Sequence, residues 1–93
     1  MDLFIQTKRM IRGVDGYKLE NGMACHRSIV PEDKSWVIVD IDSGLMIKEN
    51  MKSVKSCREY SIDNPDKEKL DKIKETTRYK KYVEKINYLK NLE

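Results

Sequence analysis

All four glycines of this 93-residue chain lie before Asp63. Glycine serves tight turns and weakens helices, so the chain divides into a turn-rich part and a part that can form long helices. The first part also holds most of the β-branched residues, which favour strands. The distribution predicts an α+β fold in a single domain of residues 1–93. Its parts are a β-rich region at 1–49, a short helix at 50–60 and a C-terminal helical segment at 64–92.

Turn residues divide the β-rich region into short extended segments. Residues 3–11 alternate between two faces and are expected to form one strand, which ends in a turn at 13–16. Asn21-Gly22 stands between the extended segments 17–20 and 23–29. It predicts a hairpin, because both residues tolerate the positive φ angles of a type I′ turn.

The most apolar segment of the chain is 36–41, Trp-Val-Ile-Val-Asp-Ile. Because it is apolar on both faces, it is expected to be a central strand. A polar loop at 31–34 precedes it, and a turn at 42–44 leads into a last strand at 45–48. These segments predict a four- or five-stranded antiparallel sheet, covered on one face by the C-terminal helical segment.

Helical spacing begins near Asn50. Met51, Val54 and Cys57 recur three residues apart, and Ser53 is available to cap a short helix. Asn64 is expected to be the N-cap of the C-terminal helix, with the following proline at its first position.

The apolar residues of the C-terminal segment change face part-way along. One stripe comprises Leu70, Ile73 and Thr77. At about 100° per residue, a second stripe lies nearly opposite: Tyr79, Tyr82, Val83, Ile86 and Leu89. Two alternatives stay open: the helix is kinked near Thr76-Thr77, where β-branched residues weaken helix propensity, or a straight helix presents one stripe to a partner outside the domain.

Inward-facing apolar residues of the predicted strands and helix are expected to form the core. They are Leu3, Ile5, Ile11, Leu19, Met23, Cys25, Trp36 or Val37, Ile38, Val39, Leu45, Ile47, Leu70 and Ile73. Apolar residues make up 39% of the chain and charged residues 38%, so this core is thin. No apolar run approaches the roughly 20 residues of a membrane span. Two cysteines and a Lys-rich C-terminus fit a reducing compartment, so we expect a cytoplasmic protein without a membrane partner.

Cysteine and histidine give no convincing catalytic or zinc pattern. Cys25 and His26 are adjacent on a predicted strand, so their side chains point to opposite faces. A pairing of His26 with Cys57 stays open, although nothing local supports it. One histidine and two distant cysteines also lack the paired spacing of a structural zinc site.

Two acidic patterns suggest metals, and each departs from its motif. The segment 40–44 resembles the start of a calcium loop, but its glycine is fifth rather than sixth, and Met51 stands where a glutamate is needed. Glu32 and Lys34 have the Glu-x-Lys spacing of many metal-dependent nucleases, with Asp15 or Asp40 as a further ligand. They lie in a predicted loop rather than on a core strand. We therefore expect no cofactor, no metal and no enzyme, with a small metal-dependent nuclease as the second alternative.

Basic residues gather in one segment, opposed there only by Glu49: Lys48, Lys52, Lys55 and Arg58. Such a segment can follow phosphates or an acidic protein surface, and Tyr17 and Trp36 could supply stacking, as in single-strand binders. A basic DNA- or RNA-binding module is therefore the first alternative function, although the whole chain has a net charge of only +3.

The second helical stripe is a candidate protein interface. Tyrosine is enriched at interfaces, and an apolar stripe without a partner is typical of an interaction surface. A two-fold dimer is the commonest closed assembly. The alternative is that the stripe packs on the sheet, with Tyr79, Val83 and Ile86 in the core. We therefore expect either this packing or a homodimer or partner contact through Tyr82, Ile86 and Leu89.

The stretch 36–45, Trp-Val-Ile-Val-Asp-Ile-Asp-Ser-Gly-Leu, followed by a Lys-rich segment and a helix, resembles a pattern in small phage-encoded accessory proteins. In these, an aromatic-aliphatic strand turns through Asp/Ser/Thr-Gly into a second apolar strand. The resemblance implies a mobile-element origin and a role in blocking a host defence complex, as anti-CRISPR proteins do. It carries no catalytic residue across. The expected function is a small non-catalytic binding protein, an inhibitor that occupies the surface of a host protein or of a nucleic-acid-processing complex.

Overall fold

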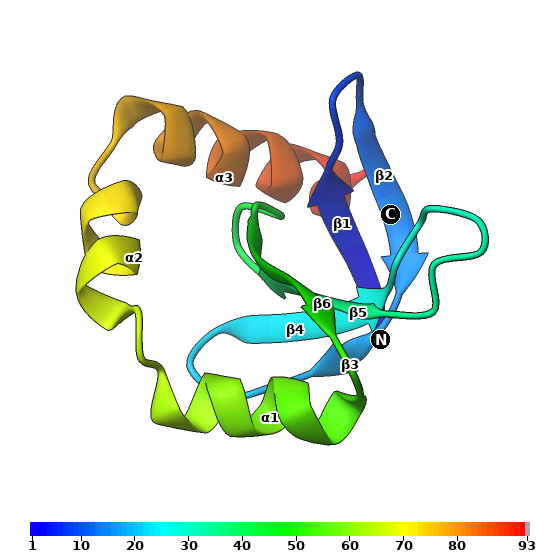
Figure 1. The fold of residues 1–93 in the computed structure, drawn as a ribbon. Helices are drawn as coiled ribbons and strands as arrows, with labels where there is room; N and C mark the ends of the chain where they lie inside the picture. Colours follow the sequence, from blue (N-terminus) through cyan, green and yellow to red (C-terminus); the bar gives the residue numbers. More distant parts are fainter. Residues whose placement is uncertain (93) are drawn as a thin grey trace.

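The computed structural model describes residues 1–92, which form an α+β fold with three helices and six strands (Figure 1). The elements are β1 (Asp2–Gln6), β2 (Ile11–Asp15), β3 (Tyr17–Lys18), β4 (Met23–Arg27), β5 (Trp36–Asp40), β6 (Met46–Met51), α1 (Val54–Asp63), α2 (Lys67–Lys74) and α3 (Thr77–Asn91). The predicted fold class is confirmed. The strands form two antiparallel sheets, a pair β1-β2 and a four-stranded sheet in the order β3-β4-β5-β6.

The first hairpin differs from the prediction of one strand over residues 3–11. The chain turns at 7–10, so β1 pairs with β2, and the predicted turn at 13–16 begins inside β2. Thr7 stabilises the observed turn, because its hydroxyl donates to the Met10 carbonyl (2.7 Å) and accepts from the Met10 N–H (3.3 Å). The turn places Lys8 and Arg9, both exposed, at the tip of the hairpin.

In the larger sheet, the predicted central strand and the predicted hairpin are confirmed. β5 lies between β4 and β6. Asn21 and Gly22 join β3 to β4 with φ angles of 56° and 73°, as a type I′ turn requires. Gly44 has a φ of 72°, and a Cβ there would lie 2.5 Å from the Phe4 carbonyl oxygen. Only glycine therefore lets the turn between β5 and β6 pack against β1.

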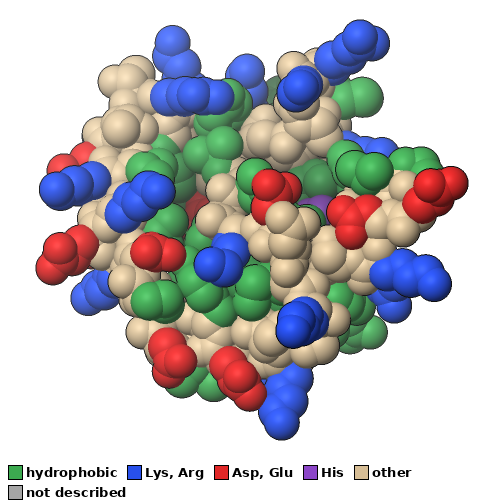
Figure 2. All heavy atoms as spheres, in the orientation of Figure 1, with side chains coloured by type: hydrophobic (Ala, Val, Ile, Leu, Met, Phe, Trp, Pro, Cys, Tyr) green, Lys and Arg blue, Asp and Glu red, His purple; other side chains and the backbone are tan. Residues whose placement is uncertain are grey.

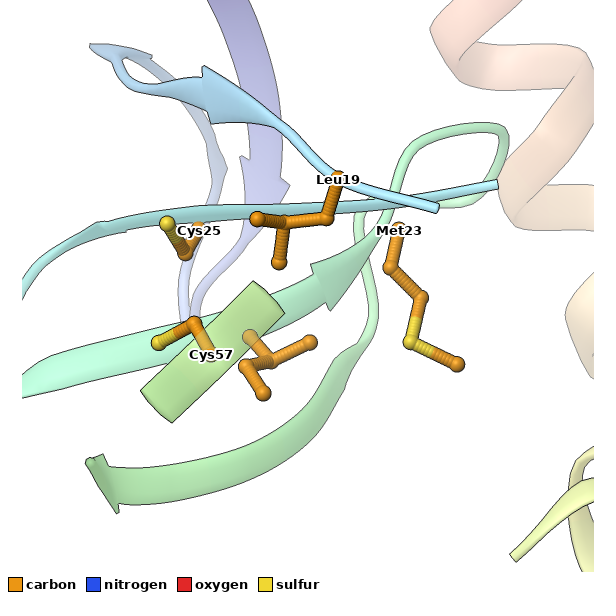
Figure 3. Close-up of a cluster of buried hydrophobic side chains, with 5 residues drawn as sticks. Leu19, Met23, Cys25 and Cys57 are labelled. Carbon is orange, nitrogen blue, oxygen red and sulfur yellow. The ribbon is translucent and has the colours of Figure 1, made fainter. Parts of the chain in front are cut away.

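The central strands β4 and β5 are buried on both faces. Because side chains alternate along a strand, these strands contribute to two separate buried clusters. Toward α1, the buried cluster is Leu19, Met23, Cys25, Ile38 and Cys57. Figure 3 shows Cys25 of the sheet and Cys57 of α1 in this layer. Toward the β1-β2 pair, the buried cluster is Leu3, Ile5, Ala24 and Val39. The sheet is covered differently from the prediction: α1 makes the main contacts with β4, β5 and β6, and from the C-terminal segment Leu70 of α2 packs against the same cluster.

The short helix forms with the predicted cap, but its bounds differ from 50–60. The Ser53 hydroxyl accepts from the Ser56 N–H, and the Ser56 hydroxyl accepts from the Ser53 N–H, each at 3.1 Å. Asn50 and Met51 belong to β6, because β6 continues to the residue before the turn into the cap. The prediction that Asn64 starts the next helix is also wrong. Asn64 ends α1 in the left-handed conformation, which asparagine tolerates, and its N–H donates to the Tyr60 carbonyl at 2.8 Å.

The C-terminal segment breaks between α2 and α3, beside the predicted kink. The Thr76 hydroxyl accepts from the Tyr79 N–H at 3.2 Å, which caps α3, and donates to the Ile73 carbonyl at 2.7 Å, which closes α2. Of the two alternatives left open by the sequence, the structure has the break. The break is caused by the Thr76 side chain, which caps α3 and ends α2, in addition to the weak helix propensity of Thr76-Thr77.

Most of the predicted core is buried: Leu3, Ile5, Leu19, Met23, Cys25, Ile38 and Val39. Others are half-buried: Ile11, Trp36, Val37, Leu45, Ile47 and Leu70. Ile73 is wrong as a core residue, since it lines a cavity and is 36% exposed. Four buried apolar residues lie outside the predicted core set: Ala24, Cys57, Tyr79 and Ile86. No helix within residues 1–92 has the length and apolar character to cross a membrane.

Candidate functional site

A groove runs between the β1-β2 hairpin and α3, with a volume of about 700 Å³. Its walls are residues 6–11 of the hairpin and, from α3, Tyr82, Glu84, Lys85, Tyr88 and Leu89. Figure 2 shows Lys and Arg side chains along the upper edge of the molecule, over α3 and the hairpin tip. The groove is the place where the predicted helical stripe and the basic residues of the first hairpin meet.

Three cations border the groove: Lys8 and Arg9 from the hairpin tip, and Lys85 from α3. None of them has a carboxylate oxygen within 4.0 Å in residues 1–92. Glu84 is the only acidic residue among the groove residues. The groove therefore has an excess of positive charge that attracts anions.

Tyrosine rings supply the flat apolar surface of the groove. Tyr82 is held by its neighbours on α3, because Arg78 and Lys85 lie over its ring, 5.5 Å and 5.8 Å from the centroid. The Arg78 Nε–H also donates to the Tyr82 hydroxyl at 3.2 Å. Tyr88 is 66% exposed, which leaves its ring free to stack on another flat group.

The structure divides the predicted interface Tyr82, Ile86 and Leu89. Tyr82 and Leu89 are half-buried and line the groove. Ile86 is wrong as an interface residue: it is 0% exposed and packs inside the chain, on the same face of α3 as Tyr79 seven residues earlier. Self-association through Tyr82 and Leu89 stays a prediction.

The predicted basic segment lies outside the groove, and its role as a binding surface stays a prediction. Lys48, Lys52, Lys55 and Arg58 are all exposed, but Lys48 lies over the Tyr60 ring at 5.5 Å. Residues 58 and 60 are about 200° apart on a helix, so Arg58 is on the other flank of α1. Burial raises the pKa of the Cys25 thiol, and the positive charge of Arg58 opposes this increase. None of the four lines the groove.

The two aromatic residues suggested for stacking are brought together elsewhere. The Tyr17 and Trp36 rings lie 5.8 Å apart at 49°, and Arg27 lies 5.2 Å above the Trp36 ring. Arg27 already covers a face of that ring, and Trp36 is half-buried. Tyr17 is 55% exposed, so each ring of this pair is less exposed than Tyr88 at 66%.

The catalytic and metal candidates remain apart. Cys25 faces α1, whereas His26 is buried on the opposite face of the sheet, where its Nδ1 lies 2.6 Å from the Arg27 carbonyl. Glu32 is exposed in the loop before β5, and Asp40 is buried at the far end of that strand. Residues 1–92 contain no cluster of three or more His, Cys, Asp or Glu side chains able to hold a metal.

Hairpin residues are the part of the groove that the sequence analysis did not assign to a site. The available signal for a tight turn was Thr7, because a threonine hydroxyl can hydrogen-bond to the backbone of a turn. Comparison with family models, with curated proteins and with solved structures finds no match to this chain.

Proposed function

We propose that this protein is a non-catalytic binding protein whose groove holds single-stranded nucleic acid. The observation that carries the proposal is that Lys8, Arg9 and Lys85, without carboxylate partners in residues 1–92, line the same groove as the exposed ring of Tyr88. Cations beside an open aromatic ring are the components with which proteins bind single strands.

Each component of the groove matches one part of a nucleotide. The three cations attract the phosphates, and this attraction does not depend on base sequence. The Tyr88 ring offers a stacking surface to a base, and stacking of this kind contributes about 1–3 kcal/mol per base. The binding we propose is therefore weakly selective for sequence and sensitive to salt.

An acidic protein surface is the competing occupant of the groove. It would contact the same cations and the same tyrosine ring, since tyrosine is enriched at interfaces, and the titrations below distinguish the two partners. The inhibitor of a host complex that the sequence analysis predicts stays a prediction, and no contact described above identifies a protein partner. A nucleic-acid-binding inhibitor would combine both hypotheses.

The proposal is tested by titrating a fluorescent twelve-nucleotide thymidine strand with the full chain and following anisotropy at low salt. We expect Tyr88→Ala to weaken binding roughly 5- to 150-fold, which is the loss of one stacked base. We expect Lys85→Glu to weaken it about tenfold, because it removes one phosphate contact and introduces repulsion.

Lys80→Glu is the matched control, because Lys80 is an exposed lysine of the same helix that lies outside the groove. We expect this variant to bind within about twofold of the unaltered protein. Equal losses in Lys80→Glu and Lys85→Glu would contradict a localised groove. A loss confined to Lys55→Glu would assign binding to the predicted basic segment instead. Binding of an acidic peptide but not of the strand would favour a protein partner.

A further inference from the structure

A second, more enclosed cavity lies between α2, the start of α3 and the end of the four-stranded sheet, with a volume of about 380 Å³. Its walls are mainly apolar, from Met23, Ile47, Leu70 and Ile73. Figure 2 shows apolar side chains gathered between α2 and β6 on the face of the molecule that it displays. A cavity of this size and character is typical of a site for a small apolar group.

At the inner end of the cavity lies Asp40, which is 6% exposed. Its Oδ2 accepts three hydrogen bonds: from the Tyr79 hydroxyl (2.7 Å), the Ser43 hydroxyl (2.7 Å) and the Ser43 N–H (3.0 Å). Its other oxygen, Oδ1, receives none from residues 1–92, and it is not sealed from solvent. Asp40 is nearly buried and lines an apolar cavity, so a ligand that donates a hydrogen bond to Oδ1 would be favoured there.

The outer end of the cavity has the opposite charge. Lys74 of α2 and Arg78 of α3 line it, and neither has a carboxylate oxygen within 4.0 Å in residues 1–92. Arg78 is also the residue that contacts Tyr82, a wall of the groove. Arg78 therefore connects the cavity to Tyr82 in the groove, along which we propose that a nucleic-acid strand runs.

We propose that this cavity binds the base of a nucleotide that carries an exocyclic amino group. The flat base lies among the apolar walls, its amino group donates to Oδ1 of Asp40, and its phosphate lies outside near Lys74 and Arg78. The inference rests on the proposed nucleic-acid function, since the strand in the groove delivers the base. Cytosine suits the site because its N4 amino group is a natural donor to a carboxylate. Uracil presents a carbonyl oxygen at the same position and is repelled.

Cytidine and uridine monophosphate test the inference, because they differ at the group that faces Asp40. Titration of the full chain, followed by calorimetry, is expected to show cytidine monophosphate binding about tenfold more tightly than uridine monophosphate. In Asp40→Asn the amide oxygen can still accept from Tyr79 and Ser43, while the amide N–H₂ takes the place of Oδ1. We therefore expect this variant to reverse the preference in favour of uridine monophosphate.

Ile73→Trp fills the cavity without altering the Asp40 hydrogen bonds, and it is expected to abolish binding of both monophosphates. Ile62→Trp, at an exposed position of α1 that is outside the cavity, is the control and should bind normally. Equal affinity for the two monophosphates, or unchanged binding by Ile73→Trp, would overturn the inference. If Asp40→Asn does not fold, as judged by circular dichroism, the Ile73→Trp result and the wild-type preference still decide it.

The thymidine strand separates this inference from the proposed function. Thymine lacks the amino group, so Ile73→Trp should bind this strand as the unaltered chain does, through Tyr88 and Lys85. Strand binding without a preference between the monophosphates would overturn only the cavity assignment. A monophosphate preference without strand binding would overturn the groove, and with it the delivery of the base by a strand.

Discussion

The Tyr79 hydroxyl donates a 2.7 Å hydrogen bond to Oδ2 of Asp40 and so joins α3 to the end of β5. Both residues are buried. Burial, and then the nearby Asp40 carboxylate, raise the pKa of Tyr79 well above the ordinary range of a phenol. The Tyr79 hydroxyl therefore stays neutral and donates to Asp40. This bond holds the start of α3 against the end of β5, beside the cavity.

Removing this hydroxyl should destabilise the fold. We expect Tyr79→Phe to lower the free energy of unfolding by about 1–3 kcal/mol, because a buried carboxylate loses one of its donors. Urea denaturation followed by circular dichroism measures the change. Tyr88→Phe is the control and should stay within about 0.5 kcal/mol of the unaltered protein, because its ring is exposed. Equal effects of the two substitutions would show that the Tyr79–Asp40 bond does not join the two elements.

Stability should fall at alkaline pH. Burial raises the pKa of the Cys57 thiol from 9.0 to about 12, and burial together with Asp66 raises that of Tyr60 from 10.0 to about 12. The unfolded chain releases these protons at lower pH than the folded chain does. The stabilisation is therefore complete below pH 9 and is lost as the pH rises from 9 to 12.

Urea denaturation at a series of pH values between 7 and 11 measures this dependence. Tyr60→Phe removes one of the titrating groups, so its stability should decline less steeply above pH 10. A free energy of unfolding that stays constant from pH 9 to 11 would contradict the raised pKa values of Cys57 and Tyr60 in the folded chain.

Strand positions were predictable where local chemistry and burial agree. Asn21-Gly22 admits few alternatives to a type I′ turn, and 36–41 is too apolar to lie at an edge. The first hairpin was not predictable from alternation, because residues 3–11 keep an alternating pattern through the turn. Its cause is a pair of hydrogen bonds between Thr7 and Met10 that periodicity does not register.

The candidate site was predictable only in part, because it joins distant segments. Tyr82 and Leu89 were identified from helical spacing, whereas Lys8 and Arg9 were not assigned to a site. Nothing in the sequence places the hairpin tip beside α3, since that contact depends on the break at Thr76 and on the Tyr79–Asp40 bond. Ile86 was assigned to the interface because the spacing of a stripe does not indicate which of its residues face the core.

The break between α2 and α3 should depend on one side chain. Thr76→Ala removes the cap of α3, and we expect it to lower the free energy of unfolding by about 1 kcal/mol. Thr76→Ser keeps a hydroxyl that can accept from the Tyr79 N–H, so it should retain most of the stability. Thr77→Ala, one residue further on, is the control, and urea denaturation compares the three. An equal loss for Thr77→Ala would contradict the assigned cap.

Trp36 provides an internal reporter, because it is the single tryptophan of the chain. It lies beside Tyr17 and Arg27, and none of these three residues lines the groove. We therefore expect its fluorescence to stay unchanged when the thymidine strand binds. Quenching that saturates with the strand would place the nucleic acid on Tyr17 and Trp36 instead.

The salt dependence of strand binding is the strictest test of a nucleic-acid groove. Three groove cations on a single strand predict that the logarithm of the affinity falls with the logarithm of the salt concentration with a slope of roughly −2. Replacing both Lys8 and Arg9 with glutamine should reduce that slope to roughly −0.7, because one phosphate contact remains. An affinity that does not respond to salt, or a slope that the double replacement leaves unchanged, would contradict a nucleic-acid groove between the hairpin and α3.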